Sequence, residues 1–123
     1  MTVGLASSVV NGWLDGTFAT ATCWVKLHTA DPNTGSTAAA AGDTTRKQAT
    51  MAAAAGGSKA ASASVGPWTN GGTSETLSHI SIWSASSAGT FQGSAALTAS
   101  QAWANTNTFT LTSLSIAVTP IAA

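Results

Sequence analysis

Two histidines, one cysteine and four acidic residues are the side chains of this sequence that could carry acid–base or metal chemistry. His28 and Asp31 lie three residues apart, where an alternating apolar segment gives way to the turn sequence Asp-Pro-Asn-Thr-Gly. A histidine close to a carboxylate can serve as a general base, but such a pair more often forms a hydrogen bond that stiffens a turn. We therefore predict that this pair is structural.

The spacing of the possible ligands argues against a metal site. A calcium loop of the EF-hand type that began at Asp31 would need a glycine at its sixth position and an acidic residue at its twelfth. These positions are Ser36 and Gly42. Zinc needs three or four ligands, whereas Cys23 and His28 fall on opposite faces of one predicted strand. We predict no metal-binding residue.

Motifs for nucleophilic catalysis and phosphate binding are also missing from the sequence. No G-x-S-x-G elbow presents a serine, and the Gly-Gly-Ser-Lys stretch at 56–59 lacks the residue order of a phosphate-binding loop. The few acidic residues, none of them beyond Glu75, argue against glycoside hydrolysis by paired carboxylates. We predict no catalytic or cofactor-binding residue, and therefore no enzyme.

The five tryptophans are the most distinctive of the remaining side chains. Indole rings can stack on sugars, but tryptophan is also enriched in protein cores and subunit interfaces. We favour a core or interface role for these residues. Leu5 and Val9, on the same stripe of the predicted helix as Trp13, could join such an interface. The interface candidates are therefore Leu5, Val9, Trp13, Trp24, Trp68 and Trp103.

The low charge of the chain is its most unusual property. Only 7% of the residues are Asp, Glu, Lys or Arg, the formal net charge is zero, and an ordinary soluble domain has roughly 25%. From Thr76 to Ala123, His79 is the only residue with a titratable side chain. This composition argues against nucleic-acid binding, which requires a basic patch. It suggests a surface that other protein subunits cover.

The sequence also bears on the cellular location. No run of about 18 apolar residues is present, so we predict no membrane segment, and no secretory signal is visible at the N-terminus. The single cysteine excludes a disulfide framework within the chain. We expect assembly in a cytoplasm.

Apolar periodicity predicts one helix followed by strands. In Val3–Asp15 the apolar residues recur at helical spacing and form one stripe, and Gly16 is in the position of a helix-ending glycine. Alternation then predicts strands. Their ranges are Thr22–His28, Arg46–Met51, Lys59–Val65, Glu75–Ser84, Thr90–Leu97, Phe109–Leu111 and Leu114–Val118.

Details of the strands set the expected fold. Glu75–Ser84 is expected to be central, with Ile80 and Ile82 on one face and Leu77 on the other. Gly66-Pro67 is predicted to end a strand, and a break is predicted near Ser113. The sequence therefore predicts a mainly β, compact antiparallel β-sandwich or small barrel with one N-terminal helix. It forms a single domain, with the helix in 1–16, a β domain in 20–123 and a flexible loop around 31–45.

Four stretches of the chain, taken in order, carry a resemblance to a known family. They are WVKLHTADP (24–32), TTRK (44–47), ETLSHISIWSASSAGTFQGSAALT (75–98) and NTFTLTSLSIAV (107–118). The chain resembles small virion proteins of tailed bacteriophages, which are described as tail fibre, minor tail or minor capsid (head decoration) proteins. The resemblance implies a structural protein without catalytic residues.

The position in the virion is predicted on physical grounds. A tail fibre usually has long repeats or a coiled-coil stalk, and this chain has neither. We therefore expect a capsid decoration protein on the capsid surface, which binds the major capsid protein and copies of itself, with a trimer as one candidate assembly, through multivalent contacts. We expect no nucleic acid, membrane or cofactor. The alternative is a tail fibre or tail-tip component that contacts host surface glycans.

Overall fold

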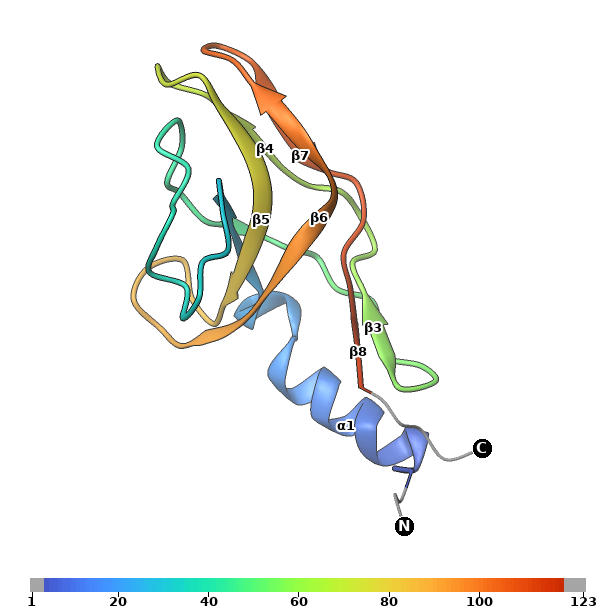
Figure 1. Cartoon of the computed structure of the whole chain (residues 1–123). Helices are drawn as coiled ribbons and strands as arrows, with labels where there is room; N and C mark the ends of the chain where they lie inside the picture. The colour runs from blue at the N-terminus through green and yellow to red at the C-terminus, as the bar shows by residue number, and fades with distance from the viewer. Residues whose placement is uncertain (1–3, 119–123) are drawn as a thin grey trace.

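One helix is followed by short and long strands in the computed structural model, which describes residues 4–118 (Figure 1). Helix α1 (Ser7–Thr17) and a 3-10 turn (Thr20–Thr22) precede the first strand. The strands are β1 (Trp24–His28), β2 (Lys47–Gln48), β3 (Ser58–Ala60), β4 (Val65–Thr69), β5 (Glu75–Trp83), β6 (Phe91–Trp103), β7 (Thr108–Leu111) and β8 (Ser115–Ala117).

The strands pair in three antiparallel sheets. The largest has the order β2-β1-β5-β6, and the two others are the pairs β4-β7 and β3-β8. Figure 1 shows the curved strands β4 to β7 in one body, with α1 at one end beside β3 and β8. The mainly β, antiparallel prediction with one helix is confirmed, and the arrangement fits a β-sandwich because the sheets do not close into a barrel.

The core lies on one face of the four-stranded sheet. Val25 and Leu27 of β1, together with Cys23 directly before the strand, alternate along the chain and are fully buried, as the period of two predicts. They pack with Trp68 and Trp103, which are also fully or almost fully buried. The opposite face of β1 carries His28, and the segment between β1 and β2 covers it.

Strand β5 is central, as predicted, but its faces differ from the prediction. Leu77, Ile80 and Ile82 all belong to the same core cluster, although strict alternation places Leu77 opposite Ile80. The register between β5 and β6 shifts between Leu77 and His79. Between these pairs β5 advances two residues (Leu77 to His79) whereas β6 advances five (Gln101 to Ala96), so the extra residues lie in β6. The interrupted ladder breaks the strict alternation between Leu77 and Ile80.

Two other strand predictions are wrong in detail. Gly66-Pro67 does not end a strand but lies within β4, at a register shift between Val65 and Trp68 where the ladder does not need a proline N–H. Strand β6 extends to Trp103 rather than Leu97, because its second half pairs with the beginning of β5. The predicted break near Ser113 is present and separates β7 from β8, which pair with different strands.

Helix α1 is shorter at its start than predicted. Ala6 has an extended backbone (φ −62°, ψ 136°) and caps the helix, so the helix begins at Ser7. Val3 lies outside the described residues. At the other end Gly16 lies inside the helix, and the amide of Phe18 donates to the carbonyl of Leu14 (2.8 Å). The helix contacts β3.

Candidate interaction surfaces

Polar side chains fix which face of α1 points inward. The amide of Gly57 donates to Asn11 Oδ1 (2.9 Å), and Lys59 Nζ donates to Asp15 Oδ1 (2.7 Å) and to the carbonyl of Ala52 (2.8 Å). Lys59 itself is only 5% exposed. The hydrogen bond from Lys59 is the main reason why the pKa of Asp15 is lowered. These contacts attach α1 to the segment around β3.

The outward face of α1 carries the largest exposed apolar side chains of the described chain. Val10 and Leu14 are buried, whereas Val9 is 45% and Trp13 55% exposed. The single stripe predicted from the sequence therefore divides into a buried and an exposed row. Leu5, just before the helix, is half-buried. Val9 and Trp13 are thus free to contact another molecule, and Leu5 is only partly so.

Two of the tryptophan candidates do not present a surface to a partner. Trp68 and Trp103 are 0% and 1% exposed and lie in the core, where Trp68 Nε1 donates to the carbonyl of Thr45 (3.0 Å). They fill the space between the sheets. Trp24 is half-buried, and its Nε1 donates to the carbonyl of Ala21 (3.2 Å). Of the three tryptophan candidates in the β domain, Trp24 therefore is the one that retains substantial exposed surface.

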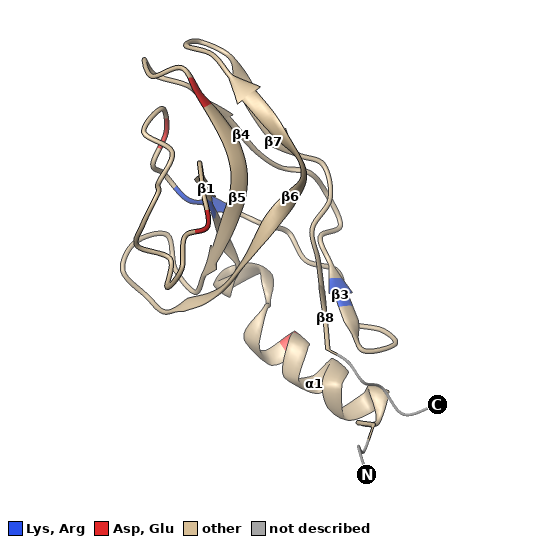
Figure 2. Cartoon of the chain, in the orientation of Figure 1, with Lys and Arg blue, Asp and Glu red and all other residues tan. Residues whose placement is uncertain are grey.

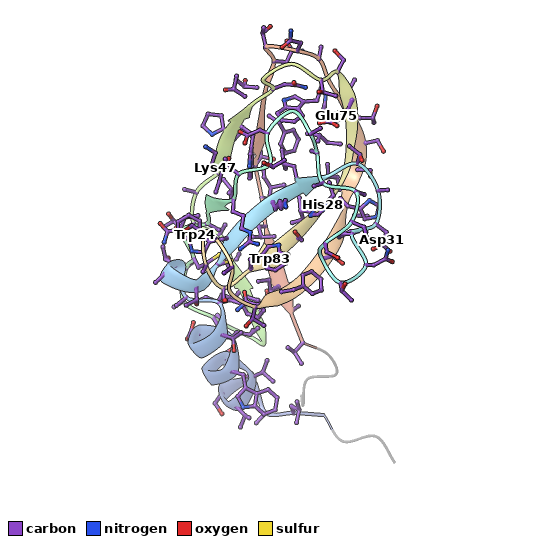
Figure 3. All side chains as sticks on the ribbon, turned by 90° about the vertical axis from the view of Figure 1, so that its left-hand side faces the viewer. Trp24, His28, Asp31, Lys47, Glu75 and Trp83 are labelled. Carbon is purple, nitrogen blue, oxygen red and sulfur yellow. The ribbon has the colours of Figure 1, made fainter. Side chains whose placement is uncertain are left out.

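His28 has different partners from the one expected. Its Nδ1 lies 2.8 Å from the carbonyl oxygen of Thr37 and its Nε2 lies 2.7 Å from Ser81 Oγ. Asp31 instead accepts a hydrogen bond from the amide of Asn33 (2.9 Å) and closes its own turn. Figure 3 shows His28 within the molecule and Asp31 on the loop outside it. The predicted His28–Asp31 hydrogen bond is therefore wrong.

The histidine and serine are enclosed rather than arranged around a cleft. Both side chains are 0% exposed, and Trp83 Nε1 also donates to Ser81 Oγ (2.8 Å). Burial is the main cause that lowers the pKa of His28. The arrangement holds the covering segment on the sheet and offers a substrate no direct path to the hydroxyl.

The other acidic residues also have local structural roles. Both carboxylate oxygens of Glu75 accept backbone amides, from Ala41 (3.2 Å) and Gly42 (2.8 Å), and Asp43 binds the amide and hydroxyl of Thr45. Among residues 4–118 no three potential ligands cluster around a possible metal position. In the same part of the chain no helix has the length and apolar character needed to cross a membrane.

Arg46 anchors the loop that connects β5 with β6. Its Nη1 donates to the carbonyls of Ala85 (2.9 Å) and Ala88 (2.7 Å). The guanidinium carbon lies 3.9 Å from the ring centre of Trp83, a cation–π geometry. Trp83 in turn packs edge-on against Phe91, with 5.6 Å between ring centres. This corner of the molecule is therefore tightly connected.

A groove of about 520 Å³ lies between β6 and the stretch formed by β7 and the segment that connects it to β8. Its floor includes Ile80, and its walls come from 95–98 and 109–115. Figure 2 shows that β6, β7 and β8 carry neither basic nor acidic residues. Sequence periodicity missed this surface, because the small residues of β6 do not alternate and because a strand's position in the sheet depends on distant partners.

The comparison with protein families bears directly on function. The family described as podophage GP4 fiber I protein gp80 matches residues 1–119. The chain belongs to this family. No curated protein matches the chain. The expected relation to small virion proteins of tailed phages is confirmed, and the chain is a phage structural protein of the virion. A fibre family favours the predicted alternative, a tail fibre component, over a capsid decoration protein.

Proposed function

We propose that this chain is a structural subunit of a podophage tail fibre. The observation that carries the proposal is the family match, which extends over residues 1–119 and names a fibre protein. The missing repeats and coiled-coil stalk, which favoured a capsid position, are compatible with a fibre built from compact β modules. A second argument is the neutral surface, which suits contacts with other subunits.

The partners that we propose are further copies of the chain and neighbouring tail subunits. The exposed row of α1 is the best candidate contact, because Val9 and Trp13 are the large apolar side chains that the described chain leaves in solvent. Apolar and aromatic residues of this kind dominate the binding energy of protein interfaces.

Immunogold labelling of intact virions tests the position. Antibodies against this chain are expected to label the tail, and quantitative mass spectrometry is expected to find far fewer copies than of the major capsid protein. Antibodies against the major capsid protein serve as the control for labelling of the shell. Gold distributed over the whole capsid, with copies in the hundreds, would overturn the proposal and favour capsid decoration.

A Trp13→Ser variant tests the proposed contact. We expect the variant to fold but to be incorporated into virions less than the wild-type chain when both are supplied in trans to a phage that lacks the gene. Ser8→Ala, a change at another exposed position of α1, is the matched control. Equal incorporation of Trp13→Ser and the control would show that this face is not the contact.

A further inference from the structure

We propose that the segment Thr29–Ala40, hereafter the strap, is an acid-sensitive device that protonation of His28 releases from the four-stranded sheet. This inference goes beyond the fibre assignment, because it concerns a property of the folded chain wherever in the virion the chain is placed. It rests on the hydrogen bonds that join the strap to β1 and β5.

The strap is attached to the sheet at two levels. At its end, the amide of Ala40 donates to the carbonyl of Leu27 in β1 (3.0 Å), and Ala39 forms a β-bridge with His28, while the amide of Thr29 donates to the carbonyl of Ala38 (2.9 Å) within the strap. Beneath its middle, the His28 ring contacts the carbonyl of Thr37. The prediction that the region around 31–45 is flexible remains a prediction. His28 supplies a side-chain hydrogen bond between the sheet and the strap. The strap also packs against the molecule through Pro32, which is fully buried, and through Gly35, which lies beside Trp83 and Phe91.

The partners of His28 determine where its proton lies. The carbonyl of Thr37 can only accept, so Nδ1 carries the hydrogen and donates across the 2.8 Å distance. In neutral imidazole Nε2 is then bare and accepts from the Ser81 hydroxyl (2.7 Å). Ser81 Oγ in turn accepts from Trp83 Nε1 (2.8 Å). When His28 is neutral, each hydrogen of this hydrogen-bond series (Trp83 Nε1–H, the Ser81 hydroxyl and His28 Nδ1–H) therefore has an acceptor.

A second proton on the His28 ring disrupts this series of hydrogen bonds. With hydrogen on both ring nitrogens, Nε2–H points at Ser81 Oγ, which already accepts from Trp83. The serine hydrogen then needs a new acceptor, although His28 and Ser81 are 0% exposed. A buried donor without an acceptor, next to a buried charge, is strongly unfavourable. Opening the strap gives both groups access to water.

The charged groups around His28 act in the same direction. Burial is the largest cause and lowers the pKa of His28; the hydrogen bond to the carbonyl of Thr37 raises it, and the charges of Lys26 on β1 and His79 on β5 lower it, so that the net direction is downward. Arg46 adds a positive charge over the ring of Trp83. Asp31, the acid within the strap, is engaged with the amide of Asn33. In residues 4–118, the one ion pair between side chains joins Lys59 and Asp15, so it does not involve His28.

The sign of the pH effect follows from these positions. The closed strap holds His28 with a pKa below the ordinary value of 6.5, whereas the open strap exposes it to water. The open state therefore binds the proton more tightly. The closed strap is fully favoured above pH 6.5 and loses stability as the pH falls below that value.

Hydrogen exchange measured by mass spectrometry tests the release. After correction for the intrinsic pH dependence of exchange, we expect protection of residues 29–40 to fall at least about fivefold between pH 7.5 and pH 5, while β1 and β5 stay protected. His28→Gln keeps a hydrogen-bond acceptor but does not titrate between pH 5 and pH 7.5. This variant is expected to show the same protection of residues 29–40 at both pH values. His79→Gln is the matched control and is expected to retain it.

The proton position supplies a second readout that does not depend on opening. Long-range nitrogen–proton NMR spectra at pH 7.5 are expected to show His28 in the Nδ1–H tautomer. A proton on Nε2, unchanged strap protection in the wild type, or the same loss in His28→Gln would each overturn the proposal. So would simultaneous loss of protection in the strap, β1 and β5, because that result indicates global unfolding.

Discussion

Glycine at position 35 is required both by its backbone and by its neighbours. Gly35 has a φ of 92°, a region that other residues rarely adopt. A Cβ there would lie 2.5 Å from Phe91 Cδ2 and 2.7 Å from Trp83 Cζ2. The glycine thus lets the turn after β1 approach the aromatic pair that also receives Arg46.

We expect Gly35→Ala to lower the free energy of unfolding by more than about 1 kcal/mol. Alanine is strained at this positive φ, and its methyl group would collide with the rings of Phe91 and Trp83. Gly12→Ala is the matched control. Gly12 lies inside α1 with open space where its Cβ would be, so alanine is expected to raise stability by about 0.5–1 kcal/mol. Urea unfolding followed by circular dichroism measures both, and effects of the same sign would contradict the account.

Cys23 is expected to be chemically inert in the folded protein. The residue is fully buried, and burial raises the pKa of its thiol to about 11. At pH 8 the thiolate that reacts with disulfide reagents is therefore scarce and inaccessible. A thiol-exchange dye should react with the native protein only at the rate of unfolding and at once in denaturant. Rapid reaction of the native protein would show that this core is open.

At the residue scale, the sequence predicts which face of a strand a side chain lies on better than it predicts the hydrogen-bond partner of that side chain. Alternation correctly placed Cys23 and His28 on opposite faces of β1, and the Asp31–Gly35 turn is present. The partner of His28 was wrong, because Ser81 is 53 residues away and comes into contact only through the pairing of β1 with β5. Tryptophans in the core and tryptophans at a surface likewise cannot be distinguished without the packing of the sheets.

At the scale of elements, α1 illustrates the same limit. Val9 and Trp13 are as apolar as Val10 and Leu14, so periodicity alone gives one broad stripe. Asn11 Oδ1 and Asp15 Oδ1, which accept hydrogen bonds from the segment around β3, turn Val10 and Leu14 toward the core. Which row is buried is therefore decided by residues about 45 positions away.

This orientation predicts unequal effects of two adjacent substitutions. Leu14→Ala removes a buried side chain and is expected to lower the free energy of unfolding by about 2–5 kcal/mol. Trp13→Ser replaces a side chain that is 55% exposed. It is expected to change the free energy of unfolding by about 0.5 kcal/mol or less. Guanidinium titrations of both variants measure the difference. A larger effect of Trp13→Ser would mean that the rows are reversed.

The strands were predicted well where apolar residues alternate and poorly where small residues prevail. Strand β5 was located to within one residue at its end, and β1 to within two at its start. Strand β6 was predicted six residues too short, because its second half contains Ala, Ser, Thr and Gln and is defined by pairing with Glu75–Leu77. Bulges in β4 and β6 shift the register: Gly66-Pro67 marks the one in β4, whereas the larger one in β6, between Ala96 and Gln101, falls in a stretch without Gly or Pro.

At the scale of the whole molecule, the few charges are placed for local contacts. The chain has four basic and four acidic residues, and Figure 2 shows them on α1, β3 and the β1–β2–β5 side. Arg46, Lys59, Asp15 and Glu75 all form hydrogen bonds within the chain. Long-range electrostatics therefore contributes little to the stability of the fold.

We expect the free energy of unfolding to change by less than about 0.5 kcal/mol between 0.05 and 0.5 M sodium chloride at pH 7.5. The choice of pH keeps His28 neutral, so that the strap does not contribute. Urea titrations at the two salt concentrations measure the effect, and sodium sulfate, which strengthens burial of apolar surface, provides a positive control. A change of several kcal/mol with sodium chloride would show that surface charge stabilises the fold.

Strand β3 connects the beginning of the described chain with its end. Residues of α1 bind its flanks, and β8 pairs along it from Ser58 to Ala60. During translation α1 leaves the ribosome before β3, but β3 gains β8 as its partner only when Ser115–Ala117 has emerged. A prematurely terminated polypeptide would lack this closing strand. Quality-control proteases should therefore distinguish polypeptides without β8 from those in which β8 has paired with β3.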